Sequence, residues 1–307
     1  MGTPEFAVTI LKNLVDQNYN IVGVITAADK PAGRGRKLNQ SAVKTYATEE
    51  GLTVLQPTNL KDEAFTEQLK ALNANLQIVV AFRMLPQSVW QMPEYGTFNL
   101  HASLLPQYRG AAPINWAIIN GETTTGVSTF FIDDKIDTGE MILQESVATD
   151  PKENAGTLHD KLMHLGAKLV LETVKLIEKG DVKTRAQIET KDLKTAYKLN
   201  RDNCKIDFEA PKETIYNLIR GLDPYPAAYC ILINGDESIE VKIHEVDLEN
   251  ETHNYNPGQL FISKKEIKVA VKGGYLNVLS LKLSGKRKMK AIDLLNGYNF
   301  EENAKLL

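Results

Sequence analysis

The strongest constraint on the fold is an alternation of helical and strand-like segments in the first half of the chain. Three segments have apolar residues at helical spacing, and each is followed by a short apolar run typical of a buried strand; these runs cover residues 21–26, 53–56 and 76–82. Such an alternation is typical of a parallel sheet with helices on both faces. The sequence therefore predicts an α/β fold with a Rossmann-like, mostly parallel sheet.

The pattern changes after residue 180. A polar stretch is followed by a helical segment at Lys212–Arg220 and then by short strand-like runs separated by Gly, Asn and Asp. Short strands with such turn residues predict a small barrel. We therefore expect an α/β domain over residues 1–182, a linker over residues 183–200 and a small, OB-like C-terminal β-barrel domain over residues 201–307.

The start of the chain is unusual for such a sheet. A doubly wound sheet normally begins with a strand, and its first loop lies at the carboxyl end of that strand. Here Met1 directly precedes GTPEFA, which resembles that first loop and the helix after it. We therefore expect the first strand to be missing from this sequence, with the apolar faces of its neighbours exposed as a result.

Composition excludes several classes of protein. The chain has 307 residues, 43% of them hydrophobic, and a formal net charge of −3, so it is not basic overall. Cys204 and Cys230 are the only cysteines and are not spaced as CxxC, so we expect neither a disulfide framework nor a metal site. No apolar run has the length of a membrane span and no leader is recognisable, so we expect a cytoplasmic protein.

The stretch GTFNLHASLLPQYRG, Gly96–Gly110, contains the clearest candidate chemistry. Asn99 and His101 are two residues apart in a predicted strand and so point to the same face, near the carboxyl edge where open α/β sheets bind ligands. Asn can donate to an oxyanion, and His can move a proton near neutral pH. Asp137, followed by Thr-Gly in a predicted turn, offers a carboxylate to the imidazole. From the residues alone, a structural histidine and a solvated turn remain alternatives.

These residues resemble the formyltransferase family that uses 10-formyltetrahydrofolate. The family signature is an Asn-x-His strand, an SLLPxYRG loop and a downstream Asp-Thr-Gly, which NLHASLLPQYRGAAPINWAI and DDKIDTGEM match. The segments GTPEFAV, DKPAGRGRKL, LDPYPAAY and LSGKRKM resemble, in the same order, the branch of the family that formylates methionyl initiator tRNA for translation initiation. The resemblance covers nearly the whole chain.

The resemblance implies roles for particular residues. The catalytic triad would be Asn99, His101 and Asp137. The folate-binding loop would contain Ser103, Leu104, Leu105 and Pro106. The pterin ring would be held, largely by backbone groups, at Phe82, Arg83, Met84 and Leu85. This last segment departs from the Ala-Tyr-Gly form common in the family, because Arg83 stands near the position of the glycine.

Two basic segments suggest contacts with methionyl initiator tRNA. DKPAGRGRKL resembles an insertion loop that enters the acceptor stem, with candidate contacts at Arg34, Arg36 and Lys37. Between residues 257 and 290, nine Lys and Arg residues face one acid, Glu266, and the best candidates for phosphate contact there are Lys286, Arg287 and Lys288. Ordinary solvated side chains are the alternative. We expect a monomer without membrane contact.

Other functions stay open at this point. A formyltransferase acting on an amino sugar or a purine precursor would share the triad without needing the basic segments. A formyl-folate hydrolase would use the triad to activate water, and a nucleic-acid-binding protein with an inert α/β domain would not bind folate. A dinucleotide oxidoreductase is disfavoured, because no GxGxxG follows a predicted strand.

Overall fold

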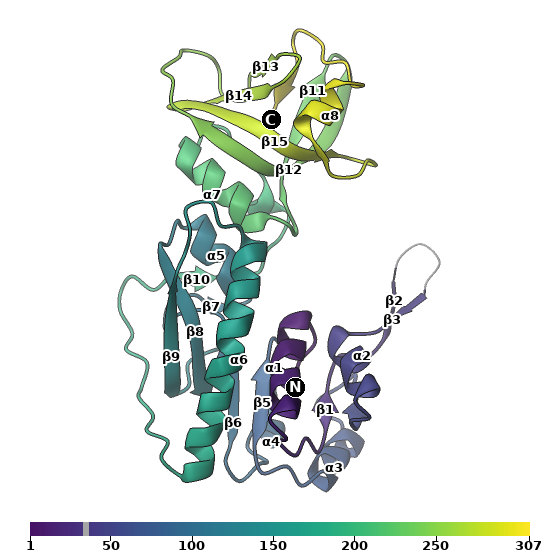
Figure 1. Cartoon of the computed structure of the whole chain (residues 1–307), viewed down its shortest axis with the longest axis vertical. Coiled ribbons are helices and arrows are strands. Elements are labelled where there is room, and N and C mark those ends of the chain that lie inside the picture. Colours follow the sequence, from purple (N-terminus) through teal and green to yellow (C-terminus); the bar gives the residue numbers. More distant parts are fainter. Residues whose placement is uncertain (33–36) are drawn as a thin grey trace. The chain divides into compact units, whose positions relative to one another are not determined.

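The computed structural model describes residues 1–32 and 37–307, which form two compact units (Figure 1). The α/β unit comprises residues 1–110, 125–147 and 159–195. The barrel unit comprises residues 111–124, 148–158 and 196–307. This division does not follow the boundaries expected at residues 182 and 201. Most of the expected linker packs with the α/β unit, and two short segments from the first half of the chain pack with the barrel.

The α/β unit is built on a mixed sheet. Its strands are β1 (Val24–Ile25), β4 (Val54–Leu55), β5 (Gln77–Val80), β6 (Thr97–His101), β8 (Thr124–Phe131) and β9 (Met141–Ala148). β1 pairs in parallel with β4, and β5 with β6, whereas β6 pairs antiparallel with β8. The expected α/β fold is confirmed. The sheet is mixed because β8 runs antiparallel to β6 in the strand order β5, β6, β8, β9.

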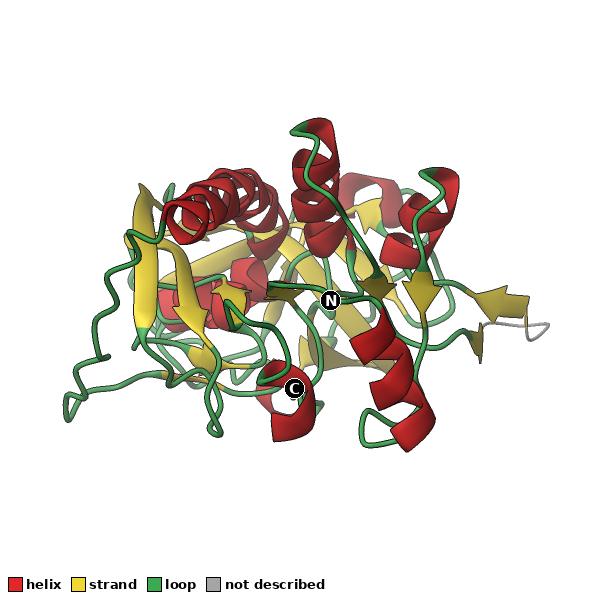
Figure 2. Cartoon of the chain, turned by 90° about the horizontal axis from the view of Figure 1, so that it is seen from below, coloured by secondary structure: helices red, strands yellow, loops and turns green. Residues whose placement is uncertain are grey.

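Helices lie on both faces of this sheet (Figure 2). They are α1 (Glu5–Asp16), α2 (Ala42–Glu49), α3 (Glu63–Ala71), α4 (Gln87–Trp90) and most of α6 (Ala155–Lys179). α3 and α4 share an apolar cluster with β1 and β5 that includes Phe65, Val79 and Val89. α6 approaches β6 closely, because a Cβ atom at Gly166 would lie only 2.7 Å from Leu100 Cδ2. This close approach holds β6 against α6.

Met1 and Gly2 lie between β1 and β5. The Gly2 N–H donates to the Ile25 carbonyl oxygen at 3.0 Å, and the Val80 N–H donates to that of Met1 at 2.9 Å. These two residues occupy the place in the sheet where the pattern predicts a first strand. Beside them lies a cavity of about 140 Å³, lined mainly by aliphatic side chains including Ile10, Leu14, Val43, Leu69 and Ile78.

In the described part of the chain, the barrel unit contains a seven-stranded sheet in the order β13, β14, β15, β12, β11, β17, with β16 beside β15. These strands are β11 (Ala228–Asn234), β12 (Glu237–Glu249), β13 (Leu260–Ile262), β14 (Ile267–Val271), β15 (Gly274–Leu283), β16 (Met289–Lys290) and β17 (Lys305–Leu306). The Leu306 N–H donates to the Gly258 carbonyl oxygen at 2.9 Å, so the two ends of the sheet meet. The expected small barrel is confirmed.

Three helices belong to the barrel unit: α5 (Pro113–Ile119), α7 (Lys212–Leu222) and α8 (Ala291–Leu295). α7 buries Ile215, Ile219 and Leu222, which share one face at helical spacing, in the barrel core. α5 packs against α7, and the Asn115 side chain donates to the Gly221 carbonyl oxygen at 2.8 Å. This packing is the reason that α5 clusters with the barrel.

The remaining elements are short. They are the hairpin strands β2 (Lys30–Ala32) and β3 (Lys37–Asn39), the two-residue strands β7 (Arg109–Gly110) and β10 (Thr195–Ala196), and a 3-10 turn at Asp202–Cys204. Across the residues that the structure describes, we find no helix with both the length and the apolar character that a bilayer crossing requires.

Phe98 tests the packing beneath the predicted catalytic strand, because its ring is fully buried in the sheet. Phe98→Ala leaves a cavity, so we expect the free energy of unfolding of the α/β unit to fall by about 3–5 kcal/mol. Urea denaturation measures this loss. As a control, Leu38→Ala removes a side chain that is 68% exposed and is expected to change stability by about 0.5 kcal/mol or less. Equal stability of the two variants would contradict the prediction.

Candidate active site

β6 places the two polar side chains predicted from sequence at the carboxyl edge of the sheet. Asn99 pairs with Phe130 and His101 with Ser128 on the neighbouring β8. Alternation along the strand puts Asn99 and His101 on one face and Phe98 and Leu100 on the other. Phe98 and Leu100 are buried, so the apolar face anchors the strand while the polar face carries the candidate chemistry.

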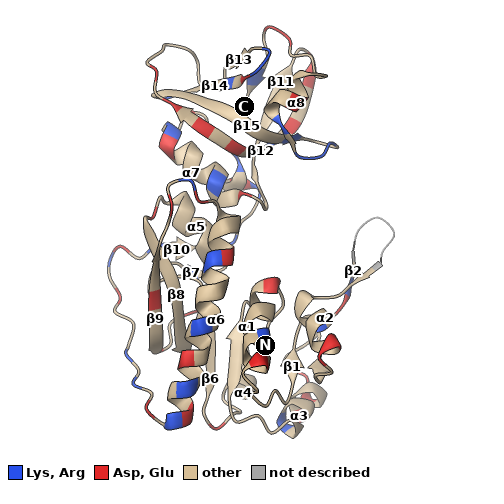
Figure 3. Cartoon of the chain, in the orientation of Figure 1, with Lys and Arg blue, Asp and Glu red and all other residues tan. Residues whose placement is uncertain are grey.

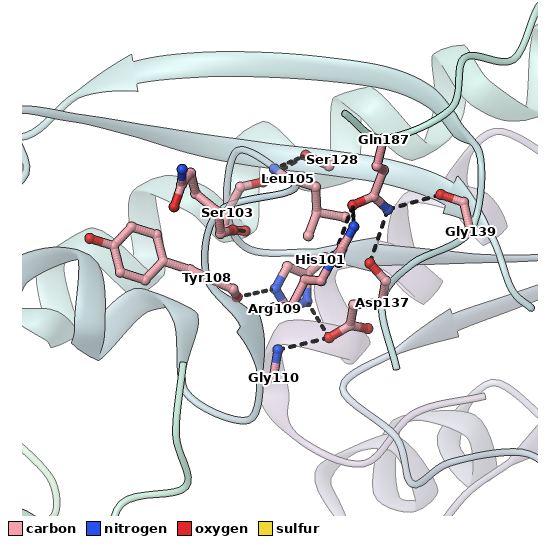
Figure 4. A network of polar contacts seen from close by, with 11 residues as sticks. His101, Ser103, Leu105, Tyr108, Arg109, Gly110, Ser128, Asp137, Gly139 and Gln187 are labelled. Atoms are coloured by element: carbon pink, nitrogen blue, oxygen red, sulfur yellow. Dashed lines mark hydrogen bonds and ion pairs between the residues drawn. The ribbon is translucent and has the colours of Figure 1, made fainter. Parts of the chain in front are cut away.

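The His101 imidazole is buried, and both ring nitrogens face groups of the protein (Figure 4). Nε2 lies 2.8 Å from the Tyr108 carbonyl oxygen. Because a carbonyl oxygen can only accept, Nε2 carries the hydrogen of this bond. Nδ1 lies 3.7 Å from Asp137 Oδ2, which is a distance for charge attraction and not for a direct hydrogen bond. The structure thus brings His101 and Asp137 together, and the Tyr108 carbonyl fixes the ring.

The Asp-Thr-Gly motif between β8 and β9 has a physical reason at each position. Asp137 has a φ of 56°, a left-handed conformation that aspartate tolerates better than most residues. The Thr138 hydroxyl donates to the Asp133 carboxylate at 2.8 Å. A Cβ atom at Gly139 would lie 1.7 Å from the Phe131 carbonyl oxygen, so only glycine fits. The motif therefore orients the Asp137 carboxylate towards His101. The same carboxylate accepts a hydrogen bond from the Gly110 N–H at 2.9 Å.

Asn99 has a side chain with free hydrogen-bonding capacity. Its amide makes no hydrogen bond to any side chain or backbone group among the described residues, although its backbone is part of β6. The side chain is partly exposed. An amide in this state has two N–H donors available to a bound molecule.

The loop after β6 is tied to the neighbouring strands. The Ser128 hydroxyl donates to the Ser103 carbonyl oxygen at 2.7 Å and accepts the Leu105 N–H at 3.2 Å. The side chains of Ser103 and Leu105 are buried, and the Ser103 hydroxyl donates to the Gln107 carbonyl oxygen at 2.7 Å. These two side chains shape the loop from beneath, whereas Leu104 and Pro106 are partly exposed.

The loop after β5 lies at the same edge, because β5 and β6 run parallel. The Arg83 guanidinium donates to the carbonyl oxygens of Pro57 and Thr58, at 2.8 Å for Thr58. Arg83 is thereby tied to the loop that follows β4. Leu85 is buried, Phe82 is partly exposed and Met84 is 64% exposed. Arg83, near the position of the family's glycine, thus supports the loop through its side chain.

The structure describes the first basic segment only in part. Arg34 and Arg36 lie outside the described residues. Lys37 begins β3, which pairs antiparallel with β2. The hairpin follows Asp29, whose carboxylate accepts hydrogen bonds from Lys44 and, at 2.7 Å, from Gln56. These two donors lower the pKa of Asp29 and anchor the start of the hairpin.

The second basic segment, Lys286 to Lys288, forms the loop between β15 and β16 of the barrel (Figure 3). Lys288 Nζ lies 3.2 Å from a carboxylate oxygen of Asp223, and His244 Nδ1 lies 2.7 Å from the same oxygen. Burial acts to raise the pKa of Asp223, but these hydrogen bonds outweigh it and leave that pKa below its ordinary value. Lys288 is therefore partly neutralised, whereas the segment's other two cations have no ion pair within the described residues.

Sequence reasoning missed three groups that hold the site. These are the Tyr108 carbonyl, the Gly110 N–H and the Gln187 side chain, which donates to the carbonyl oxygens of Asp137 and Gly139. The first two belong to the backbone, and no side-chain pattern indicates them. Gln187 lies in the polar stretch predicted to be a linker, and nothing in its sequence neighbourhood indicates the contact.

The arrangement combines an amide donor, a basic nitrogen and a carboxylate at one sheet edge. With Nε2 committed to Tyr108, Nδ1 is the nitrogen of His101 that can accept a proton. The Asp137 carboxylate then stabilises the positive charge on the ring. Such a set can stabilise an oxyanion and remove a proton from a nucleophile. Among residues 1–32 and 37–307, no group of three or more His, Cys, Asp or Glu side chains is arranged to hold a metal ion.

Comparison with known proteins identifies the family. Residues 1–174 match the model of the formyl transferase family, and residues 198–299 match that of the formyl transferase C-terminal domain. The chain belongs to the formyl transferase family. It is 63% identical over 306 residues to a methionyl-tRNA formyltransferase of Flavobacterium johnsoniae, covering all of this chain and 97% of that protein. A methionyl-tRNA formyltransferase of Bacteroides fragilis is 51% identical over 311 residues, covering 100% and 96%.

Solved structures share the fold at lower identity. A sugar 3N-formyl transferase, WlaRD, solved with dTDP and 5-N-formyl-THF, superposes with a TM-score of 0.65 at 20% identity, over 93% of this chain and 97% of that one. HypX from Aquifex aeolicus, solved with tetrahydrofolic acid, has a TM-score of 0.60 at 20% identity, over 81% of this chain and 43% of that one. At this identity the likeness establishes the fold alone.

The close approach at Gly139 yields a prediction about the triad. Gly139→Ala forces the Asp137 turn away from β8, so we expect a longer Asp137–His101 distance in a crystal structure and a fall in formyl transfer of about 100-fold. As a control, Gly297→Ala adds a methyl group where no atom lies within 4 Å and is expected to leave transfer unchanged. An unmoved Asp137 carboxylate with wild-type turnover in Gly139→Ala would contradict this.

Proposed function

We infer that this protein transfers the formyl group of 10-formyltetrahydrofolate to the α-amino group of methionyl initiator tRNA. The observation that carries this inference is the grouping of Asn99, His101 and Asp137 at the carboxyl edge of the sheet. This grouping occurs in a member of the formyl transferase family that resembles methionyl-tRNA formyltransferases over its whole length. The protein is a one-carbon transferase of translation initiation.

The residues around the triad suit a folate donor. Formyl-tetrahydrofolate supplies an activated one-carbon acyl group when it is bound. The loop containing Leu104 and Pro106 offers partly exposed apolar side chains on a backbone that is tied to β8. Phe82 and Met84 lie on the loop after β5, at the same edge, and offer apolar surface for a flat ring. Asn99 has the uncommitted donors that a formyl oxygen requires.

The geometry supports a catalytic role for each residue of the triad. The attacking amine has to be neutral, so a base must take its proton, and His101 Nδ1 is the available basic nitrogen. The Asp137 carboxylate, 3.7 Å away, stabilises the charged ring, and Tyr108 holds the ring in place. Asn99 donates to the oxygen on which negative charge develops. Removing one such donor typically costs about 100- to 1,000-fold in rate.

The two basic segments suit a tRNA as the acceptor of the formyl group. Lys286 and Arg287 lie on the exposed loop after β15, where they can contact phosphates without desolvating a buried group. Lys37 and the adjoining Arg34 and Arg36 belong to the basic segment that resembles an acceptor-stem loop. We propose tRNA binding by both segments. The monomeric state and the cytoplasmic location expected from the sequence remain predictions.

A formyltransferase acting on an amino sugar is the main competing function. Its support is the fold shared with WlaRD at 20% identity. An amino-sugar acceptor gives no role to the two basic segments, whereas a tRNA acceptor uses both. The relatives from Flavobacterium johnsoniae and Bacteroides fragilis are methionyl-tRNA formyltransferases, so tRNA is the favoured acceptor.

Transfer of a labelled formyl group tests the function directly. The purified protein, incubated with 10-formyltetrahydrofolate and methionyl initiator tRNA, is expected to give formyl-methionyl-tRNA, and His101→Ala is expected to lower the rate at least about 100-fold. The same assay with an amino sugar nucleotide measures the competing activity. Labelling of the sugar and not of the tRNA would reject the proposal.

The exposed basic loop gives a separate prediction. The double substitution Lys286→Ala and Arg287→Ala is expected to raise KM for tRNA about tenfold and to leave KM for the folate donor unchanged. The affinity for tRNA should also fall less steeply with added salt, by the amount that corresponds to the loss of about two phosphate contacts. Lys70→Ala and Lys179→Ala on the α/β unit remove the same charge as a control. If tRNA affinity depends on salt concentration equally steeply in the loop variant and in the control, the loop does not contact tRNA phosphates.

A further inference from the structure

We propose that Gln187 is a positioning residue for Asp137 and that the segment containing it, residues 185–194, is part of the active site. The inference rests on the proposed function for the meaning of Asp137, and on geometry for the rest. Figure 4 shows the Gln187 side chain between Arg109 and the turn that contains Asp137. No side chain of the triad belongs to this segment, which the sequence pattern assigned to a linker.

The Gln187 amide uses all of its hydrogen-bonding capacity here. Nε2 donates to the carbonyl oxygens of Asp137 and Gly139, each at 2.9 Å. Oε1 accepts from Arg109 Nε at 3.1 Å and from Arg109 Nη2 at 2.8 Å. Two donated and two accepted bonds are what one primary amide can make with these partners.

The orientation of this amide is fixed by its partners. A guanidinium only donates, so the atom facing Arg109 must be the oxygen, and backbone carbonyls only accept, so the atom facing Asp137 and Gly139 must be the nitrogen. The Arg109 Nη1 atom lies 3.3 Å from Glu189 Oε1, which helps to hold the guanidinium against the same segment. A flipped amide would oppose like groups on both sides.

The two carbonyls that Gln187 holds flank Thr138. They are the two ends of the turn in which Asp137 has its left-handed φ of 56°. A sparsely populated backbone conformation persists when its surroundings over-determine it. The Gln187 bonds supply that determination on one side of the turn, and the Gly110 N–H bond to the Asp137 carboxylate supplies it on the other.

The segment is held at both ends, so Gln187 is presented from a fixed backbone. Near its start, Arg185 and Met141 exchange two backbone hydrogen bonds of 2.9 and 3.0 Å. At its end, the Tyr108 N–H donates to the Lys194 carbonyl oxygen at 2.7 Å, and the Lys194 N–H donates to Gln107 Oε1 at 2.8 Å. Tyr108 is the residue whose carbonyl fixes the His101 ring, so the same segment supports both His101 and Asp137.

The substitution Gln187→Glu separates positioning from simple tethering. A carboxylate keeps the acceptor that Arg109 needs, so the segment stays attached, but it has no N–H to donate and repels the two carbonyl oxygens. Gln187→Ala removes both functions. The control is Thr184→Val, directly before this segment, which removes a side-chain hydrogen bond to Glu140 and none of the bonds that Gln187 makes.

For Gln187→Glu we expect kcat for formyl transfer to fall about 10- to 100-fold, because a small displacement of a catalytic group has effects of this size. KM for the folate donor and for tRNA, and the melting temperature, are expected to stay near wild type. Thr184→Val is expected to retain wild-type kcat. If Gln187→Glu keeps wild-type turnover while Gln187→Ala loses it, the side chain only tethers the segment and the proposal is overturned.

A measurement without substrate keeps this test separate from the proposed function. The imidazole resonances of His101, observed by ¹⁵N-edited NMR in the free enzyme, report the proximity of the Asp137 carboxylate. We expect them to shift in Gln187→Glu and Gln187→Ala and to stay in place in Thr184→Val. Unchanged resonances in both Gln187 variants would overturn the proposal. A wild-type protein that does not formylate tRNA would overturn the proposed function and leave the positioning result standing.

Discussion

The hydrogen bond from His101 Nε2 to the Tyr108 carbonyl oxygen decides what the rest of the site can do. It fixes the ring plane, leaves Nδ1 as the basic nitrogen and turns that nitrogen towards Asp137. The acceptor belongs to a loop that leaves the end of β6 and curls back over it, so the strand and its own continuation hold the imidazole between them. The catalytic geometry therefore depends on the loop as much as on the strand.

Asp137 is held in place by contacts from several parts of the chain. Its position comes from a turn that only its surroundings stabilise: a glycine pressed against β8, an amide from Gln187 and a backbone N–H from Gly110. Each of these contacts is short, and each comes from a different part of the chain. Such a turn is rigid as long as all of its contacts are made together. Preorganisation of this kind is what electrostatic stabilisation of a transition state requires.

Much of the fold and part of the site could be predicted from the sequence. Alternating periodicity indicated the α/β unit and the short strands of the barrel, and strand alternation alone put Asn99 and His101 on one face. The domain boundaries followed packing that local pattern does not encode, since α5 lies against α7 about 100 residues later. The role of Gln187 could not be predicted for the same reason, because its partners Asp137 and Arg109 are 50 and 78 residues away in the sequence.

The anchoring of residues 185–194 has a consequence for the design of fragments of this enzyme. The Asn-x-His, SLLPxYRG and Asp-Thr-Gly signatures all end before residue 182, and a fragment cut there would still contain every residue of the triad. Such a fragment would lack the chain that Met141 and Tyr108 bind and would leave the Arg109 guanidinium without its acceptor. A minimal formyl-transferring fragment has to extend through Lys194, and domain exchanges between relatives should be joined beyond that residue.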